Sequence, residues 1–320
     1  MGIDLRGPAI ALAAGLLRLF VRICEDDRAL TIRIGAGTLG RFIRSPKPPW
    51  ALRVAGISIR WLGFPIRFPV REPLPVLWRC CFGTIEINAM PSFFDAYPRF
   101  YATTATQRLP NRLKQRWQMI IGENPTLFEG KRVLDLACHD GRWAFAAMKS
   151  GAREVVGIEG RPELTAHAVE NFHHYGIDES AFRFETGDVV EYLQRLDEQF
   201  DIVLNLGFFY HTLKHLEILE GMAKTKAVKF IIDTAITPSP EPVIEVVEEP
   251  VADPRNAIDH LCTNKLVAPV GYASRTAIAS MLRYVGFEME ERPWHQRVND
   301  FTECEDYRAG RRATFVATRT

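Results

Sequence analysis

Cysteine is scarce in this sequence, and its cysteines follow no pairing pattern. The chain has six cysteines in 320 residues and no C-x-x-C pair; they are Cys24, Cys80, Cys81, Cys138, Cys262 and Cys304. Small secreted domains that depend on disulfides carry cysteine at much higher density. The composition therefore excludes a disulfide framework, and we expect a cytoplasmic protein.

The sequence also lacks an apolar run long enough to cross a bilayer. The segment from Pro8 to Phe20 is apolar for about ten residues, whereas a spanning helix needs about 20. It has no clear basic start and no small-residue cleavage pattern, so it does not read as a signal peptide. Leu12, Leu16 and Phe20 recur on one helix face, which predicts core packing, with docking on a membrane surface as the alternative. We expect no stable membrane insertion.

A strong overall charge is absent too, because the net charge is +1. This argues against a polyanion partner that covers the whole molecule. The balance hides an asymmetry: residues 1–79 hold 12 Arg and one Lys against five acids, a charge of +8, so the remainder carries −7. This basic region fits phosphate, an anionic membrane surface or an acidic substrate, and a solvated basic face is the alternative.

The most informative stretch runs from Lys131 to Arg161. A short apolar run with Asp135 inside it predicts a buried parallel strand. A tight polar turn follows, then apolar residues at helical spacing from Arg142 to Lys149. A second apolar run ends at Glu159. This order of strand, turn, helix, strand and acid predicts a nucleotide-binding βαβ unit.

The turn of this unit limits the kind of ligand. Gly141 lets the backbone approach a ligand, and Glu159 is placed to accept hydrogen bonds from both hydroxyls of a ribose. Dinucleotide enzymes use G-x-G-x-x-G to admit a pyrophosphate, but this turn reads A-C-H-D-G. The sequence therefore favours an adenosine ligand without a pyrophosphate.

Several segments resemble those of class I S-adenosylmethionine-dependent methyltransferases. VLDLACHDG (133–141) resembles the family's D-x-G-x-G-x-G turn, and VVGIEG (155–160) resembles its acidic second-strand motif. The resemblance continues through TGDVVEYL (186–193), FDIVLNLGFFYHT (200–212) and KFIIDT (229–234). Ala137 and His139 stand where the family commonly has glycine. The resemblance implies an α/β, Rossmann-like, seven-stranded sheet with helices on both faces, and an antiparallel last strand.

The same resemblance implies S-adenosylmethionine as the cofactor and a set of residues around it. Asp188 is expected to accept a hydrogen bond from the adenine amino group. The expected cofactor-binding residues are Asp135, Ala137, His139, Gly141, Glu159, Gly160, Asp188, Val189 and Asn205.

The positions of these segments predict that the chain has three parts. Residues 1–90 form a basic N-terminal α+β appendage, and residues 91–130 form a mostly helical connector that the resemblance implies is a lid. Residues 131–320 form the cofactor-binding domain, with a proline-rich insertion at 237–270. A connection this long after a strand at the catalytic edge is usually functional or disordered, and we expect a second lid.

Candidate catalytic residues follow the fourth strand. His211 is the predicted general base, since histidine titrates near neutral pH, and Tyr210 is predicted to orient the substrate or to contact the cofactor. Arg116 and His260 are candidate substrate contacts. Asp233, Asp259 and His260 were the available oxygen and nitrogen ligands for a divalent ion, but their spacing follows no metal pattern, so we expect no metal.

Three functions remain open at this stage. The first is methylation of a hydroxyl on a small molecule or glycan unit. The GFFYH segment (207–211) also resembles the branch with tRNA wobble-uridine carboxymethyltransferases, in which a matching tyrosine holds a carboxylated cofactor; RNA would then be the acceptor. The third is a non-catalytic module that binds an adenosine ligand or a partner. Each is compatible with a homo-oligomer.

Overall fold

The computed structural model describes the backbone of residues 17–20, 25–26, 29–36 and 85–87, and residues 92–320 apart from 106–108, 125, 254 and 257–265. The chain divides into two compact units, residues 1–92 and 93–320. Each unit is described by itself.

The first unit contains a small antiparallel sheet. Strand β3 (Ala29–Ala36) pairs with β1 (Leu17–Phe20), β2 (Glu25–Asp26) and β4 (Ile85–Ile87). The helix predicted through Leu16 and Phe20 is wrong at its end, because Leu17–Phe20 pair with Arg33–Ala36; residues 8–16 lie outside the described part.

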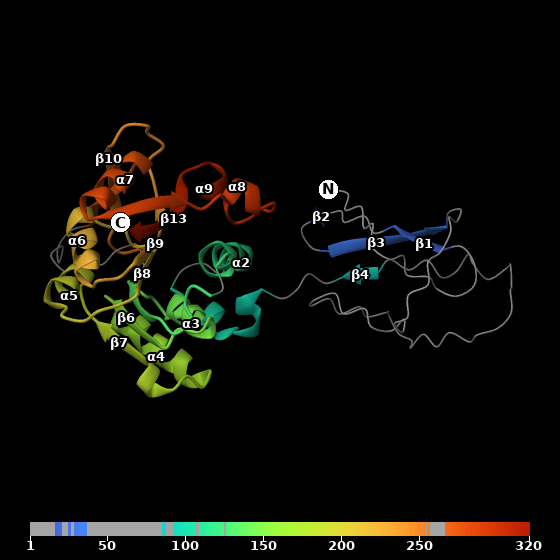
Figure 1. Ribbon diagram of the computed structural model, residues 1–320, viewed down its shortest axis with the longest axis horizontal. Coiled ribbons are helices and arrows are strands. Elements are labelled where there is room, and N and C mark those ends of the chain that lie inside the picture. The colour runs from blue at the N-terminus through green and yellow to red at the C-terminus, as the bar shows by residue number, and fades with distance from the viewer. Residues whose placement is uncertain are drawn as a thin grey trace. The chain divides into compact units, whose positions relative to one another are not determined.

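The second unit is built on a seven-stranded sheet (Figure 1). Its spatial order is β12 (Phe287–Glu291), β13 (Arg312–Arg319), β9 (Lys229–Ala235), β8 (Ile202–Leu206), β5 (Arg132–Leu136), β6 (Glu154–Glu159) and β7 (Phe182–Thr186). The five strands from β9 to β7 are parallel, whereas β13 is antiparallel to both of its neighbours. The expected α/β class, seven strands and antiparallel last strand are confirmed.

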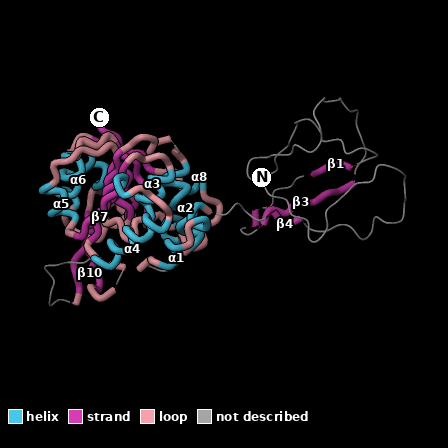
Figure 2. Tube along the Cα trace, turned by 90° about the horizontal axis from the view of Figure 1, so that it is seen from below, coloured by secondary structure: helices cyan, strands magenta, loops and turns pink. Residues whose placement is uncertain are grey.

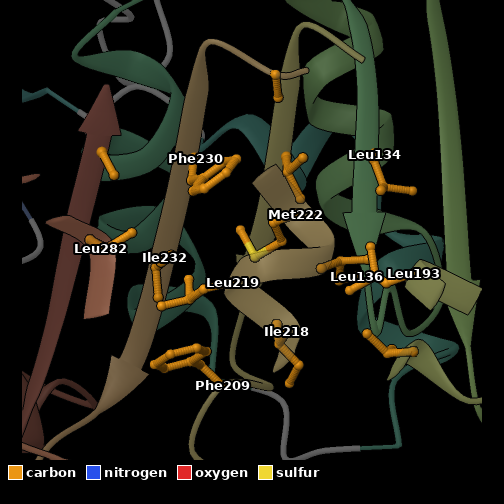
Figure 3. Close-up of a cluster of buried hydrophobic side chains, with 14 of the residues drawn as sticks. Leu134, Leu136, Leu193, Phe209, Ile218, Leu219, Met222, Phe230, Ile232 and Leu282 are labelled. Carbon is orange, nitrogen blue, oxygen red and sulfur yellow. The ribbon is translucent and has the colours of Figure 1, made fainter. Parts of the chain in front are cut away.

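Helices cover both faces because the buried strands are apolar on both sides. Leu134 packs in one core with α5 (Val189–Arg195), α6 (His215–Lys224) and α7 (Arg275–Tyr284), and Figure 3 shows part of this core. Its neighbour Val133 packs in the other core, with α2 (Pro110–Trp117), α3 (Arg142–Lys149) and α4 (Pro162–His174). Successive side chains of a strand point to opposite faces, which explains the division. Figure 2 shows α5 and α6 on one side of the strands and α2 and α4 on the other.

Short elements complete the unit. The region predicted as a helical connector holds η1 (Phe93–Ala96), α1 (Arg99–Ala102), α2 and a π-helical turn, η2 (Gln118–Gly122), and its aromatic side chains pack on α3 and α4. The remaining short helices are η3 (Glu179–Ala181), α8 (Trp294–Arg297) and α9 (Glu305–Arg308). The insertion contains an antiparallel pair, β10 (Ile244–Pro250) and β11 (Val267–Ala273).

One buried carboxylate joins β9 to three other elements. The side chain of Asp233 is completely buried and accepts hydrogen bonds from Arg116 (3.0 Å), the Tyr307 hydroxyl (2.7 Å) and the Thr314 hydroxyl (2.6 Å). The Nε of Arg312 also donates to it, at 2.8 Å. Burial by itself would raise the pKa of Asp233, but the two guanidinium charges and the hydroxyl donors outweigh burial and hold the pKa below its usual range.

The replacement Asp233→Asn should lower the free energy of unfolding by about 3–5 kcal/mol, because two nearly buried guanidinium groups lose their anion. The pKa of Asp233 is lower in the folded state, so its stabilising contribution is present above pH about 4 and is lost as the pH falls. Urea unfolding between pH 3 and 7 measures both effects. Glu185→Gln is the matched control. Glu185 pairs with Arg183 and Arg195, whose side chains are exposed, so this change should alter stability by less than about 1 kcal/mol. An equal change in both variants would contradict the buried-network account.

Candidate functional site

The turn between β5 and α3 follows an unusual backbone path. Ala137, His139 and Gly141 have φ angles of 53°, 57° and 77°. This left-handed region favours glycine, so Ala137 and His139 adopt it at a cost in strain. A Cβ atom on Gly141 would lie 3.0 Å from the Cβ of Ala168 in α4, so glycine allows this helix to approach. The turn therefore keeps the path of a glycine-rich loop with only one of its glycines.

Asp135 links the strand before the turn to the helix after it through a hydrogen bond. Its side chain is 1% exposed, and its Oδ2 accepts a hydrogen bond from the backbone N–H of Ala144 in α3, at 3.1 Å. Burial raises the pKa of Asp135 to about 8, with the nearby carboxylates of Glu159 and Asp140 adding to the shift. Asp135 lines neither of the two cavities described below, and its hydrogen bond is to the protein backbone.

Glu159 ends β6 beside this turn. Its two carboxylate oxygens accept hydrogen bonds from the backbone N–H groups of His139 (2.9 Å) and Arg161 (3.0 Å). A carboxylate has about four acceptor positions, so these two bonds leave capacity for a ligand. The bonds fix the carboxylate at the carboxyl edge of the sheet.

A first cavity, of about 120 Å³, lies over the carboxyl ends of β5, β6, β7 and β8. Asp188 lines it and also caps α5, because its Oδ1 accepts the N–H groups of Val190 and Glu191, both at 2.9 Å. An added Cβ on Gly187 would meet no atom within 4 Å, so the wall is open there. The lining residues are Ala137, Glu159, Gly160, Arg161, Gly187, Asp188, Val189, Leu206, Gly207, Phe208, His211, Arg255 and Asn256.

The other expected cofactor residues do not line this first cavity. The ring of His139 accepts a hydrogen bond from the N–H of Ala105 at its Nε2 (3.2 Å), and its Nδ1 lies 3.1 Å from Asp140. Asn205 is completely buried in β8, and its amide has no hydrogen-bond partner among the described residues. Together with Asp135 and Gly141, these residues surround or support the turn.

A second cavity, of about 340 Å³, adjoins the first. The two cavities share Leu206, Gly207, His211 and Arg255. Tyr210 lines the second cavity, with its ring 5.4 Å from the guanidinium carbon of Arg312. Of the described residues, the charged side chains in its wall are five arginines: Arg112, Arg116, Arg142, Arg255 and Arg312.

His211 belongs to the wall of both cavities and has a carboxylate partner. Its Nδ1 lies 2.6 Å from Oε2 of Glu249, in β10 of the insertion, and both side chains are at most 10% exposed. The rings of Tyr210 and His211 are 4.0 Å apart. Tyr272 lies 5.5 Å from Tyr210, and burial followed by the charge of Glu249 raises the pKa of Tyr272 to about 12. The arrangement is a histidine–carboxylate pair where the cavities meet.

The insertion reaches the carboxyl edge of the sheet. Arg255 and Asn256 line the first cavity, and the guanidinium of Arg161 donates a hydrogen bond to the carbonyl of Asn256. Asp259 and His260 lie outside the described residues. Among the described residues, no group of three or more His, Cys, Asp or Glu side chains is arranged to hold a metal ion.

Sequence reasoning did not select Glu249 or Arg312. Glu249 is one of three acids between Glu245 and Pro250, and nothing in their spacing indicates which one faces His211. Arg312 had a usable signal: an antiparallel last strand begins at the carboxyl edge, so a charged residue at its start belongs near the site. In the searched part of the chain, no helix is both long and apolar enough to cross a membrane.

Comparisons with known proteins point to a methyltransferase domain. Residues 133–228 match the family model described as a methyltransferase domain. The tRNA U34 carboxymethyltransferase of Helicobacter pylori (strain HPAG1) is 26% identical over 127 residues, which is 39% of this chain and 48% of that protein. The 23S rRNA (uracil(1939)-C(5))-methyltransferase of Shewanella amazonensis is 47% identical over 53 residues, 17% of this chain and 12% of that protein.

The chain thus spans about half the length of the U34 relatives it matches. Among solved structures, magnesium protoporphyrin IX methyltransferase from Synechocystis PCC 6803 aligns with a TM-score of 0.45 at 15% identity, over 71% of this chain and 91% of that chain. The motifs, the strand order and the family match lead to one conclusion. This chain contains a class I S-adenosylmethionine-dependent methyltransferase domain, matched over residues 133–228.

Proposed function

We propose that this domain transfers the methyl group of S-adenosylmethionine to a hydroxyl oxygen of a small molecule or glycan unit. One observation carries the proposal: His211 lies where the two cavities meet, with its Nδ1 2.6 Å from the Glu249 carboxylate. A base at this point has access to both a cofactor in the first cavity and an acceptor in the second.

The residues of the first cavity fit the adenosine part of the cofactor. Glu159 has spare acceptor capacity for the ribose hydroxyls, and Asp188 has a second carboxylate oxygen for a donor such as the adenine amino group. Ala137, Gly160 and Gly187 provide a wall of small residues. When bound, the cofactor supplies a methyl group on a positively charged sulfur.

His211 is the proposed base for the acceptor hydroxyl. With Nδ1 protonated and donating to Glu249, the lone pair is on Nε2, which can take the proton of the hydroxyl as its oxygen attacks the methyl group. Glu249 fixes this tautomer and stabilises the imidazolium that forms, as the carboxylate does in other histidine–carboxylate pairs. Asp233 is unsuited to this role, because its carboxylate is buried and occupied by four side chains.

Replacing Glu159 by glutamine should weaken binding of S-adenosylmethionine roughly tenfold to a hundredfold. Loss of a hydrogen bond to a charged group costs about 1.5–3 kcal/mol. Glutamine keeps one of the oxygens that receive backbone N–H groups, so the turn should persist. Calorimetry measures the affinity, and Glu179→Gln, on the exposed η3, is the control. Unchanged affinity in a folded Glu159→Gln protein would remove the basis for this cofactor site.

Replacing His211 by asparagine should lower turnover about 10²- to 10⁴-fold, because the general base is lost, while cofactor affinity stays nearly unchanged. Glu249→Gln should also lower turnover and should change the pH–rate profile, because the carboxylate no longer stabilises the imidazolium. His295→Asn, at an exposed position in α8, is the control. Wild-type turnover in a folded His211→Asn protein would assign His211 a structural role.

A second candidate is carboxymethyl transfer to a tRNA wobble uridine. It is favoured by the relatives named tRNA U34 carboxymethyltransferase and by Tyr210 next to Arg312, where an added carboxylate has a cation and a hydroxyl nearby. Mass spectrometry of ligands that co-purify with the full chain separates the candidates. We expect ordinary S-adenosylmethionine or S-adenosylhomocysteine; a cofactor heavier by one carboxylate would favour the second candidate. A folded protein that binds neither form would favour a non-catalytic module.

A further inference from the structure

We propose that the second cavity is an anion subsite in which Arg116 and Arg312 hold a carboxylate or phosphate group of the acceptor. The inference rests on the proposed methyl transfer and adds a substrate class to it: small hydroxylated acceptors with one anionic group.

The first step of the argument is the charge balance around Asp233. This one carboxylate forms ion pairs with two guanidinium groups, those of Arg116 and Arg312. Two hydroxyl groups also donate to it, so its acceptor positions are filled. Burial would lower the pKa of Arg312, but the charge of Asp233 outweighs burial and raises it, so Arg312 remains a cation. Within the described part of the chain, the trio of Arg116, Asp233 and Arg312 therefore has one positive charge without a matching anion.

The second step is the position of the neighbouring acids. Each of the other three arginines in the cavity wall has its own aspartate: Arg112 has Asp306, Arg142 has Asp140 and Arg255 has Asp253. None of these carboxylates lines the second cavity, and neither do Asp233 and Glu249. Glu249 is hydrogen-bonded to His211. The described charged side chains that a ligand in the cavity would contact are therefore guanidinium groups.

The third step is that the two guanidinium groups are already held in place. Arg116 lies over the ring of Trp143 (5.0 Å), and Arg312 over the rings of Tyr210 (5.4 Å) and Tyr307 (5.7 Å). Their side chains are 14% and 7% exposed, so water screens them little. The Nε of Arg116 is buried and has no hydrogen-bond partner among the described residues. A planar, ordered guanidinium with unused donors suits a carboxylate or phosphate.

The position of the two arginines relative to His211 indicates the role of a bound anion. His211 and Tyr210 line the same cavity as Arg116 and Arg312. An acceptor held by its anionic group at the arginines would present a hydroxyl to His211. The subsite would therefore select acceptors by charge and orient them for proton removal, which is the positioning role of arginine clamps.

The test is a calorimetric titration of inorganic phosphate into the full chain saturated with S-adenosylhomocysteine, at constant ionic strength. We expect one saturable site that is at least ten times weaker in Arg116→Gln and unchanged within twofold in Arg195→Gln, an exposed arginine paired with Glu185. The absence of saturable binding, or an equal loss in both variants, would overturn the subsite. Phosphate binding that is seen only without S-adenosylhomocysteine would do so as well, since the arginines would then hold the cofactor's own carboxylate.

Two further measurements keep the result decisive. If Arg116→Gln does not fold, phosphate should slow phenylglyoxal modification of Arg116 in the wild-type protein, with Arg195 as the internal reference; equal protection contradicts the proposal.

An ordinary cofactor in the co-purified material assigns the anion to the acceptor, whereas a carboxylated cofactor assigns it to the transferred group and overturns the proposal. Failure of S-adenosylhomocysteine to bind would overturn the methyl-transfer proposal itself, whereas its binding without phosphate binding overturns only the subsite.

Discussion

The network of hydrogen bonds and ion pairs around the buried carboxylate of Asp233 determines the arrangement of the second cavity, the proposed acceptor site. Asp233 lies near the carboxyl end of the buried strand β9. Its partners come from α2, α9 and β13, so one anion determines how four elements meet. A buried carboxylate is costly unless it is paired and hydrogen-bonded, which explains why two arginines and two hydroxyls converge on it. The same contacts place Arg116 and Arg312 in the wall of the second cavity. The stability of this region and the charge of its cavity therefore have one physical origin.

The cofactor side depends on backbone geometry instead. The turn after β5 keeps left-handed φ angles at Ala137 and His139, where glycine would be unstrained, and the carboxylate of Glu159 accepts the N–H of His139 from the neighbouring strand. Strain of this kind persists where surrounding contacts enforce it. The insertion then adds Glu249 to His211. The proposed catalytic pair thus combines His211, at the carboxyl edge of the sheet, with a residue of the insertion, which lies outside the sheet.

The sequence was sufficient to predict the sheet because period-two and helical patterns, glycine positions and strand-ending acids are local signals. Glu159 is the last residue of β6 and Asp188 follows β7, so both lie at the carboxyl edge of the sheet, as their positions in the sequence predicted. The contact between His211 and Glu249 spans 38 residues and depends on the register of β10 with β11, which no local pattern specifies. The same holds for Asp233, whose partners are up to 117 residues away. The spacing of apolar residues predicted a helix that included Phe20, but Leu17–Phe20 form a strand that pairs with β3. Contacts between strands can override a weak local preference for helix.

The central claim is that the two cavities form one continuous site with His211 between cofactor and acceptor. A crystal structure of the full chain with S-adenosylhomocysteine tests it most directly. The account predicts adenosine in the first cavity, with its ribose hydroxyls on Glu159, the sulfur directed toward the second cavity, and Nε2 of His211 facing the space in front of the sulfur. A sulfur atom directed away from His211, or an Nε2 hydrogen-bonded to the protein backbone in that complex, would contradict the claim.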